Sequence, residues 1–204
     1  MRNDFYPEGT AKKLLQTDFI SPQTKKVFEE RLNTPVVSEP AFFTKEEFTT
    51  LQAVSKRLLP QPEEREKKID LAGILDTNFA NKKPGNGWRY DTMPPDEVAM
   101  KRGLQAIEVS SQSRYGKAFE ALTANEQDDL LQAVQEGNRQ EEEWKNLPSD
   151  RFFEELFSSL VEVYYSHPTG RDEIGDASYA DTNGWQQIAM NNREEREPAV
   201  TDKD

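Results

Sequence analysis

The sequence contains no cysteine and only one histidine, His167, among its 204 residues. Without thiolates, the chain cannot form a disulfide, a cysteine-ligated zinc site, an iron–sulfur cluster or a covalent haem attachment. A single imidazole also excludes a histidine-rich metal site. We therefore expect no cofactor and no metal within this chain.

Apolar residues are also scarce. They make up 34% of the chain, the mean hydropathy is −0.91, and no run approaches the roughly 20 apolar residues that span a bilayer. The N-terminal residues contain no apolar segment and no twin arginine, so no export signal is visible. The expected location is the cytoplasm, and the alternative is the periplasm, reached through a partner's signal or after removal of a signal. We expect no membrane insertion by this chain.

The chain has fewer basic residues (26 Lys and Arg) than acidic ones (38 Asp and Glu), so its net charge is −12 and its sequence pI is about 4.7. Proteins that bind nucleic acid need clustered Lys and Arg for the phosphates, so nucleic acid is not an expected partner. The sequence also lacks a glycine-rich phosphate-binding motif after a strand. Nothing therefore predicts that the chain binds a flavin or a nucleotide by itself.

The most apolar stretch runs from Pro148 to Pro168 and predicts the central helix of the fold. Its large apolar residues recur at three- and four-residue steps, which places them on one broad helical face. They are Phe152, Phe153, Leu156, Phe157, Leu160, Val161 and Tyr164. Ser149 is the expected N-cap and Pro168 the expected stop. Phe157, in the centre of this face, is expected to be buried.

Further helix signals precede this stretch. Thr44 with Glu47, and Thr123 with Glu126, have the spacing of a capping box. Helical periodicity recurs over about 45–59, 69–79, 95–113 and 123–137, and strand-like alternation of useful length does not occur. The sequence thus predicts an all-α fold, an irregular helical bundle around the central C-terminal helix with long loops.

The expected organisation has three parts. Residues 1–40 are predicted to form an extended N-terminal arm with short helical pieces, residues 41–190 a helical domain, and residues 191–204 a disordered acidic tail. The arm carries apolar residues but no long apolar stripe. We therefore expect it to contribute to partner binding more than to folding, and a flexible tail is the alternative.

His167 and the loop after it are the places where chemistry could occur. His167 precedes Pro168 at a helix end, and the sequence places no nucleophile and no orienting acid beside it. We interpret it as a residue that caps backbone groups or packs at an interface. Asp172, Asp176 and Asp181 do not follow the spacing of a calcium-binding loop, so we expect this loop to be solvated.

Several short motifs occur in an order and spacing that resemble a known family. The motifs are Phe43-Thr44-Lys45-Glu46-Glu47-Phe48, Arg57-Leu58-Leu59-Pro60, Tyr115-Gly116-Lys117-Ala118-Phe119, Asp129-Leu130-Leu131, Phe152-Phe153-Glu154-Glu155-Leu156, His167-Pro168 and Asn183-Gly184-Trp185. From about Phe42 to Trp185, the chain resembles the gluconate 2-dehydrogenase subunit 3 family of small accessory subunits. It departs from that family in lacking a twin-arginine signal and in having a more acidic loop between His167 and Trp185.

This resemblance implies a non-catalytic subunit that binds and stabilises a large FAD-dependent oxidoreductase of the glucose–methanol–choline class, and that helps it mature. The partner would carry the FAD and oxidise a sugar, a sugar acid or a glycoside, and the two chains would form a hetero-oligomer. Two alternatives stay open at this point. One is a free-standing helical adaptor or chaperone, and the other is an all-α hydrolase or lyase that uses His167 with acidic residues.

Large aromatic and polar residues near two irregular segments are the candidates for the partner interface, because such side chains bury much area for little lost entropy. The candidates are Trp88, Arg89, Tyr90, Tyr165, His167, Pro168 and Trp185. The alternative is that both tryptophans fill the base of the bundle.

Overall fold

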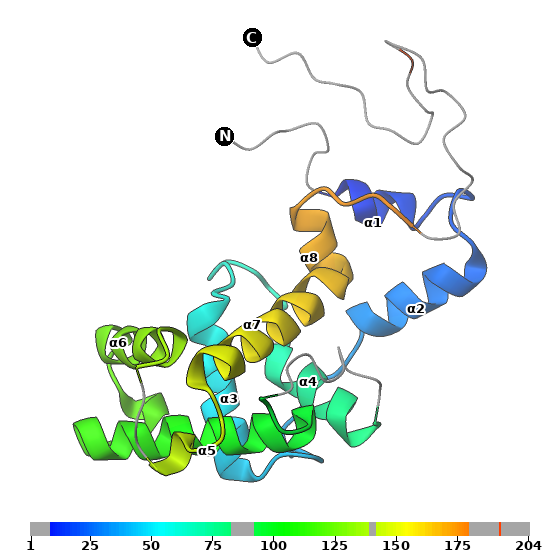
Figure 1. Cartoon of the computed structure of the whole chain (residues 1–204). Helices are drawn as coiled ribbons and strands as arrows, with labels where there is room; N and C mark the ends of the chain where they lie inside the picture. Colours follow the sequence, from blue (N-terminus) through cyan, green and yellow to red (C-terminus); the bar gives the residue numbers. More distant parts are fainter. Residues whose placement is uncertain (1–8, 83–91, 139–141, 180–191, 193–204) are drawn as a thin grey trace. The chain divides into compact units, whose positions relative to one another are not determined.

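The structure is a computed structural model of the whole chain, and it describes residues 9–82, 92–138, 142–179 and 192. These residues form eight α-helices and two short 3-10 helices, with no strand in the described ranges (Figure 1). The α-helices are α1 (Thr10–Leu14), α2 (Pro22–Leu32), α3 (Lys45–Leu58), α4 (Leu71–Ala80), α5 (Asp96–Tyr115), α6 (Ala124–Gln135), α7 (Ser149–Ser166) and α8 (Pro168–Glu173); the 3-10 helices are η1 (Phe119–Ala121) and η2 (Glu142–Trp144). The all-α prediction is confirmed. No helix in these ranges has the length and apolar character needed to cross a bilayer.

The chain divides into two compact units. The middle unit comprises residues 36–163, and the end unit comprises residues 1–35 together with 164–204. This grouping differs from the predicted one, because residues that follow the central helix are joined to residues of the expected arm. As a division into folding domains, the predicted boundaries at 40 and 190 stay predictions.

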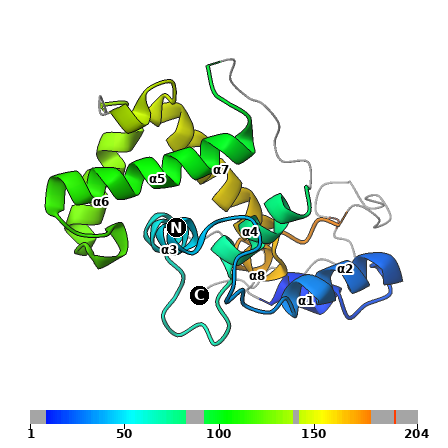
Figure 2. The ribbon, with the colours of Figure 1, turned by 90° about the horizontal axis from the view of Figure 1, so that it is seen from below.

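Within the middle unit, α3 contacts α4, α5 and α6 (Figure 1, Figure 2). The start of α3 follows directly from the sequence: Thr44 Oγ1 accepts from Glu47 N at 3.2 Å, and Glu47 Oε2 accepts from Thr44 N at 2.9 Å. The same capping box, formed by Thr123 and Glu126, begins α6. The largest fully buried side chains of this unit are Leu51, Val54, Met100, Leu104, Ile107, Phe119, Leu130, Leu147, Phe152, Leu156 and Leu160. They form its core.

A buried carboxylate fixes the chain ahead of α3. Asp76 of α4 is only 1% exposed and accepts the backbone N–H groups of Ala41 (2.8 Å), Phe42 (3.0 Å) and Phe43 (2.9 Å). The rings of Phe42 and Phe43 pack against Phe79, with centroids 4.9 and 5.8 Å away. Residues 41–43 are therefore attached to α4 by both hydrogen bonds and aromatic packing.

The expectation that Phe157 lies in the core is wrong. Phe157 is 37% exposed and stacks on Phe153, with ring centroids 6.2 Å apart. The buried line along α7 runs instead through Phe152, Leu156 and Leu160, each at most 1% exposed. Periodicity predicted the direction of the apolar face but overstated its width, because Phe157 lies about 100° around the helix from Leu156.

Close packing between α5 and α7 depends on a residue without a side chain. A Cβ added to Gly103 would lie 2.1 Å from the ring of Phe152, which is itself fully buried. The aromatic ring therefore occupies the space that any larger residue at position 103 would need. The indole of Trp144 packs against the Phe152 ring at a tilt of 54°, with the ring centroids 5.7 Å apart. It donates its N–H to the hydroxyl of Ser110 at 3.2 Å.

We expect Gly103→Ala to lower the free energy of unfolding by about 1–3 kcal/mol, because the added methyl overpacks the core against Phe152. This outcome opposes the gain of up to about 1 kcal/mol that alanine normally brings to a helix interior. Chemical denaturation of the full chain measures the change. In a double-mutant cycle, Phe152→Leu should partly relieve the strain of Gly103→Ala, and strict additivity would contradict the predicted contact.

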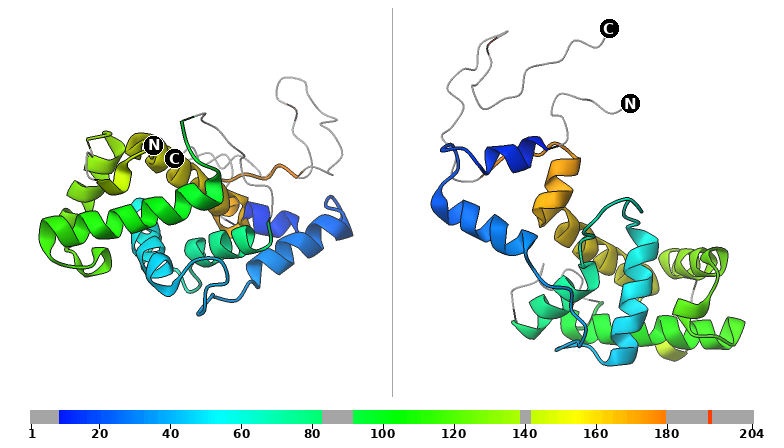
Figure 3. Two further views of the ribbon diagram at one scale, coloured as in Figure 1. Left: turned by 60° about the horizontal axis from the view of Figure 1, so that its bottom comes forward. Right: turned by 180° about the vertical axis from the view of Figure 1, so that it is seen from behind.

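In the end unit, α1 and α2 both contact α8 (Figure 2, Figure 3). A small apolar cluster of buried residues joins the two chain segments; it consists of Leu14, Leu15, Ile20, Phe28 and Tyr179. The expectation that a solvated loop follows His167 is wrong in two respects. Residues Pro168–Glu173 form a helix, and Asp172 and Tyr179 are buried at 3% and 6% exposure.

Candidate partner-binding surfaces

His167 is the N-cap of α8 and has both ring nitrogens engaged. Its Nδ1 accepts the backbone N–H of Thr169 at 3.2 Å, so the ring proton resides on Nε2. That nitrogen lies 3.1 Å from the carbonyl of Arg31 and donates to it, while the Arg31 guanidinium donates to the carbonyl of Ser166 at 2.8 Å. The side chain is 9% exposed. His167 thus orders the turn between α7 and α8 and connects it to the end of α2, in agreement with its interpretation as a capping residue.

The other predicted interface residues fall into two groups. Tyr165 is 40% exposed at the end of α7, whereas Pro168 is buried at the first position of α8. Trp88, Arg89, Tyr90 and Trp185 lie outside the described residues. Among the predicted residues that are described, Tyr165 presents the most accessible aromatic surface, and the interface roles of all seven stay predictions.

Asp172 is a structural residue that sequence reasoning missed. Its Oδ2 accepts the N–H of Gly9 at 2.9 Å, and its Oδ1 accepts those of Ala11 at 3.0 Å and Lys12 at 3.3 Å. The Lys12 ammonium lies 3.8 Å from the same carboxylate. A negative charge at the start of a helix satisfies free N–H groups and interacts favourably with the helix dipole. Asp172 therefore caps α1 from the opposite end of the sequence.

Arg171 and Tyr179 form the rest of this contact. The Arg171 guanidinium lies 5.1 Å from the ring centre of Phe28 and 4.9 Å from that of Tyr179, within cation–π range. The two rings meet edge to face at 5.1 Å, and the Tyr179 hydroxyl donates to the carbonyl of Ala11 at 2.7 Å. Burial of this hydroxyl raises the pKa of Tyr179 to about 12, although the nearby Arg171 charge acts in the opposite direction.

This shift predicts a loss of stability at high pH. In the unfolded chain Tyr179 ionises near pH 10, whereas in the folded chain it stays protonated to about pH 12. The stability that the protonated Tyr179 contributes to the folded chain is therefore complete below about pH 10, and it is lost as the pH rises through the folded pKa. Wild type should lose stability more steeply over this window than Tyr179→Phe, as measured by denaturation at several pH values. Parallel profiles for the two proteins would contradict the assignment.

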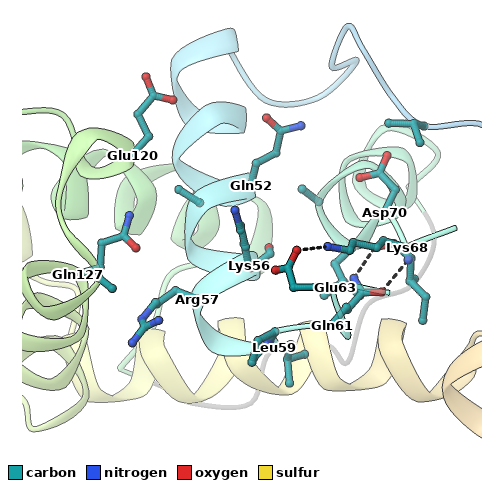
Figure 4. A pocket seen from close by; sticks show the side chains of 18 of the residues that line it. Gln52, Lys56, Arg57, Leu59, Gln61, Glu63, Lys68, Asp70, Glu120 and Gln127 are labelled. Carbon is teal, nitrogen blue, oxygen red and sulfur yellow. Dashed lines mark hydrogen bonds and ion pairs between the residues drawn. The ribbon is translucent and has the colours of Figure 1, made fainter. Parts of the chain in front are cut away.

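The middle unit has an open pocket of about 810 Å³ between the end of α3, residues 60–72 and the start of α6. In Figure 4, the α3 residues Gln52 and Lys56 stand between Glu120 and Gln127 on one side and the 60–70 segment on the other. Most polar groups at its rim have partners within the chain. Lys68 pairs with Glu63, Arg57 pairs with Asp128, and the Gln61 amide bonds both backbone groups of Ile69. The pocket thus offers no concentration of one charge that would select a ligand class.

The described part of the chain shows no cluster of side chains that could bind a metal ion. Within these ranges, no group of three or more His, Cys, Asp or Glu side chains is arranged to hold a metal ion. Two aspartates of the end unit accept backbone N–H groups instead: Asp172 accepts those at the start of α1, and Asp176 accepts that of Ser178 at 2.9 Å.

Comparison with known proteins identifies the family. A family model described as Gluconate 2-dehydrogenase subunit 3 matches residues 45–188, more than two thirds of the chain. The match contains α3 to α8, and α1 and α2 precede it. Neither the curated proteins nor the solved structures contain a match to the chain. The chain therefore belongs to the gluconate 2-dehydrogenase subunit 3 family, a family of accessory subunits.

Proposed function

We propose that this chain is the small, non-catalytic subunit of a flavin-dependent dehydrogenase. It binds and stabilises a large subunit of the glucose–methanol–choline class, which holds FAD and oxidises a sugar, a sugar acid or a glycoside, and it assists the maturation of that subunit. The observation that carries this proposal is family membership across residues 45–188.

The environment of His167 supports a non-catalytic role. This side chain is the only imidazole in the sequence, and a general base needs a free nitrogen within reach of the substrate proton. Nδ1 is engaged by Thr169 N and Nε2 by the carbonyl of Arg31. Using either nitrogen for chemistry would remove the cap of α8 or the contact with α2. The alternative of a hydrolase or lyase built on His167 is therefore disfavoured.

The proposal is tested by isolating the tagged chain from its native cells. The expected result is a stoichiometric second protein with the visible absorption of a flavin, and sugar-dependent dye reduction by the complex. The isolated small subunit should show neither property. Catalysis by the chain alone would overturn the non-catalytic role, and a stable chain that recovers no flavoprotein would favour the free-standing adaptor.

Tyr165 provides a direct test of the interface. We expect Tyr165→Ala to weaken binding of the large subunit by on the order of tenfold or more, because exposed aromatics act as anchors in protein interfaces. Phe157→Ala is the matched control, since Phe157 is an aromatic of similar exposure on the same helix, 37% against 40%, and lies outside the predicted interface residues. Titration of each variant against the large subunit measures the effect, with melting curves to confirm folding. Equal affinity for both variants would exclude Tyr165 from the interface.

A further inference from the structure

Residues 9–35 lie before the family match, yet they are folded onto its C-terminal part. We call these residues the N-terminal strap. The strap contains α1 and α2, and both helices contact α8. Its long-range hydrogen bonds described above join it to four residues of the C-terminal segment, namely Ser166, His167, Asp172 and Tyr179.

The first helix of the strap depends on these partners. α1 has only five residues, and an isolated helix of that length is not stable in water. Its N-cap, Gly9, has no side chain to satisfy the first N–H groups and adopts a left-handed φ of 92°. The Asp172 carboxylate accepts three of these groups, and the Tyr179 hydroxyl donates to the carbonyl of Ala11. α1 is therefore held as a helix by α8 and the residues after it.

The second helix is also weakly anchored. Of the 11 residues of α2, all of which are described, only Phe28 is buried, and Val27 is 43% exposed. At its C-terminal end, Arg31 exchanges hydrogen bonds with Ser166 and His167. The residues that follow, 34–37, have no regular secondary structure and lead out of the end unit. Elements with few buried apolar contacts open at lower free energy than a core does.

We propose that the N-terminal strap is a releasable cover on α8, latched by Asp172, and that it opens while the middle unit stays folded. The surface of α8 and residues 174–179 is a receptor for a short helix with an uncapped N-terminus, and the strap is its occupant. Opening breaks the contacts that the strap makes with His167, Asp172 and Tyr179 together, while Thr169 N stays on His167. This inference does not depend on the proposed function, because it concerns contacts within the chain alone.

The latch is tested by hydrogen exchange of the full chain with Asp172→Asn. The amide that replaces Oδ1 or Oδ2 is a donor, so at least one of the three N–H groups of α1 loses its acceptor, and the charge is lost as well. Amides of residues 10–14 and 23–32 should exchange on the order of tenfold faster or more, since hydrogen bonds to charged groups are the strong ones. Amides of α3, α5 and α6 should be unchanged.

Two further variants make the test specific. Glu30→Gln removes the same charge from the strap itself, at a side chain that is 65% exposed and pairs only weakly with Lys26 at 3.9 Å, and it should leave exchange unchanged. Tyr179→Phe keeps the ring, removes the bond to Ala11, and should accelerate strap exchange less than Asp172→Asn does. The proposal is overturned if strap amides of the wild type exchange as slowly as those of α5. It is also overturned if Asp172→Asn and Glu30→Gln act alike, or if Asp172→Asn accelerates every helix equally.

Discussion

Phe152→Ala is expected to lower the free energy of unfolding by about 3–5 kcal/mol, the range for truncating a fully buried Phe. Phe152 is 0% exposed, contacts Trp144 at a centroid distance of 5.7 Å, and fills the space above Gly103. Its removal would leave a cavity between α5 and α7 in the space that its ring fills. Denaturant unfolding followed by tryptophan fluorescence and by circular dichroism measures the loss.

Phe157→Ala provides the matched control on the same helix. Phe157 is 37% exposed, so its truncation should cost less than about 1 kcal/mol, as is usual for surface substitutions. The two variants remove the same atoms, five residues apart in sequence, and differ in burial. Equal losses for both would show that the face of α7 defined by Phe152, Leu156 and Leu160 is not the core face.

The contrast between these two residues shows how far sequence reasoning reaches. Helix starts that use local chemistry are predictable: the capping boxes at Thr44 and Thr123 begin α3 and α6 as expected. Burial is not local, because it depends on which neighbours cover each part of an apolar face. Phe157 fits the helical spacing of the apolar residues on α7, but it lies at the edge of their face and is 37% exposed.

The same reasoning explains what was missed after α7. Pro168 is the expected stop of α7, although proline at a first helical position also favours the start of a helix. It does so here, since His167 caps α8 and Pro168 is its first residue. Asp172 could not be identified, because its partners Gly9, Ala11 and Lys12 are at least 160 residues away in sequence. A lone aspartate in an acidic segment carries no local sign of such a contact.

Asp76→Ala is expected to lower the free energy of unfolding by about 2–4 kcal/mol, because it removes one buried acceptor that serves three backbone donors. The N–H of Phe43 is the most consequential of the three, since Phe43 is only 4% exposed and water cannot easily replace the carboxylate there. The free energy of unfolding of Asp76→Asn should lie between those of wild type and Asp76→Ala. The asparagine carbonyl oxygen still accepts hydrogen bonds, whereas its NH₂ group is a donor and cannot accept the N–H groups bound by the oxygen that it replaces.

Asp70→Ala distinguishes this effect from a general loss of charge near α4. Asp70 also accepts two backbone N–H groups, from Val37 at 2.8 Å and Gly73 at 3.0 Å, but it is half-buried and water can replace it. Its truncation should therefore cost roughly 1 kcal/mol, as for other N-cap residues. Hydrogen exchange should show residues 41–43 losing protection in Asp76→Ala and keeping it in Asp70→Ala. If both variants lose the same stability and the same protection, burial of Asp76 is not what holds the chain ahead of α3 on α4.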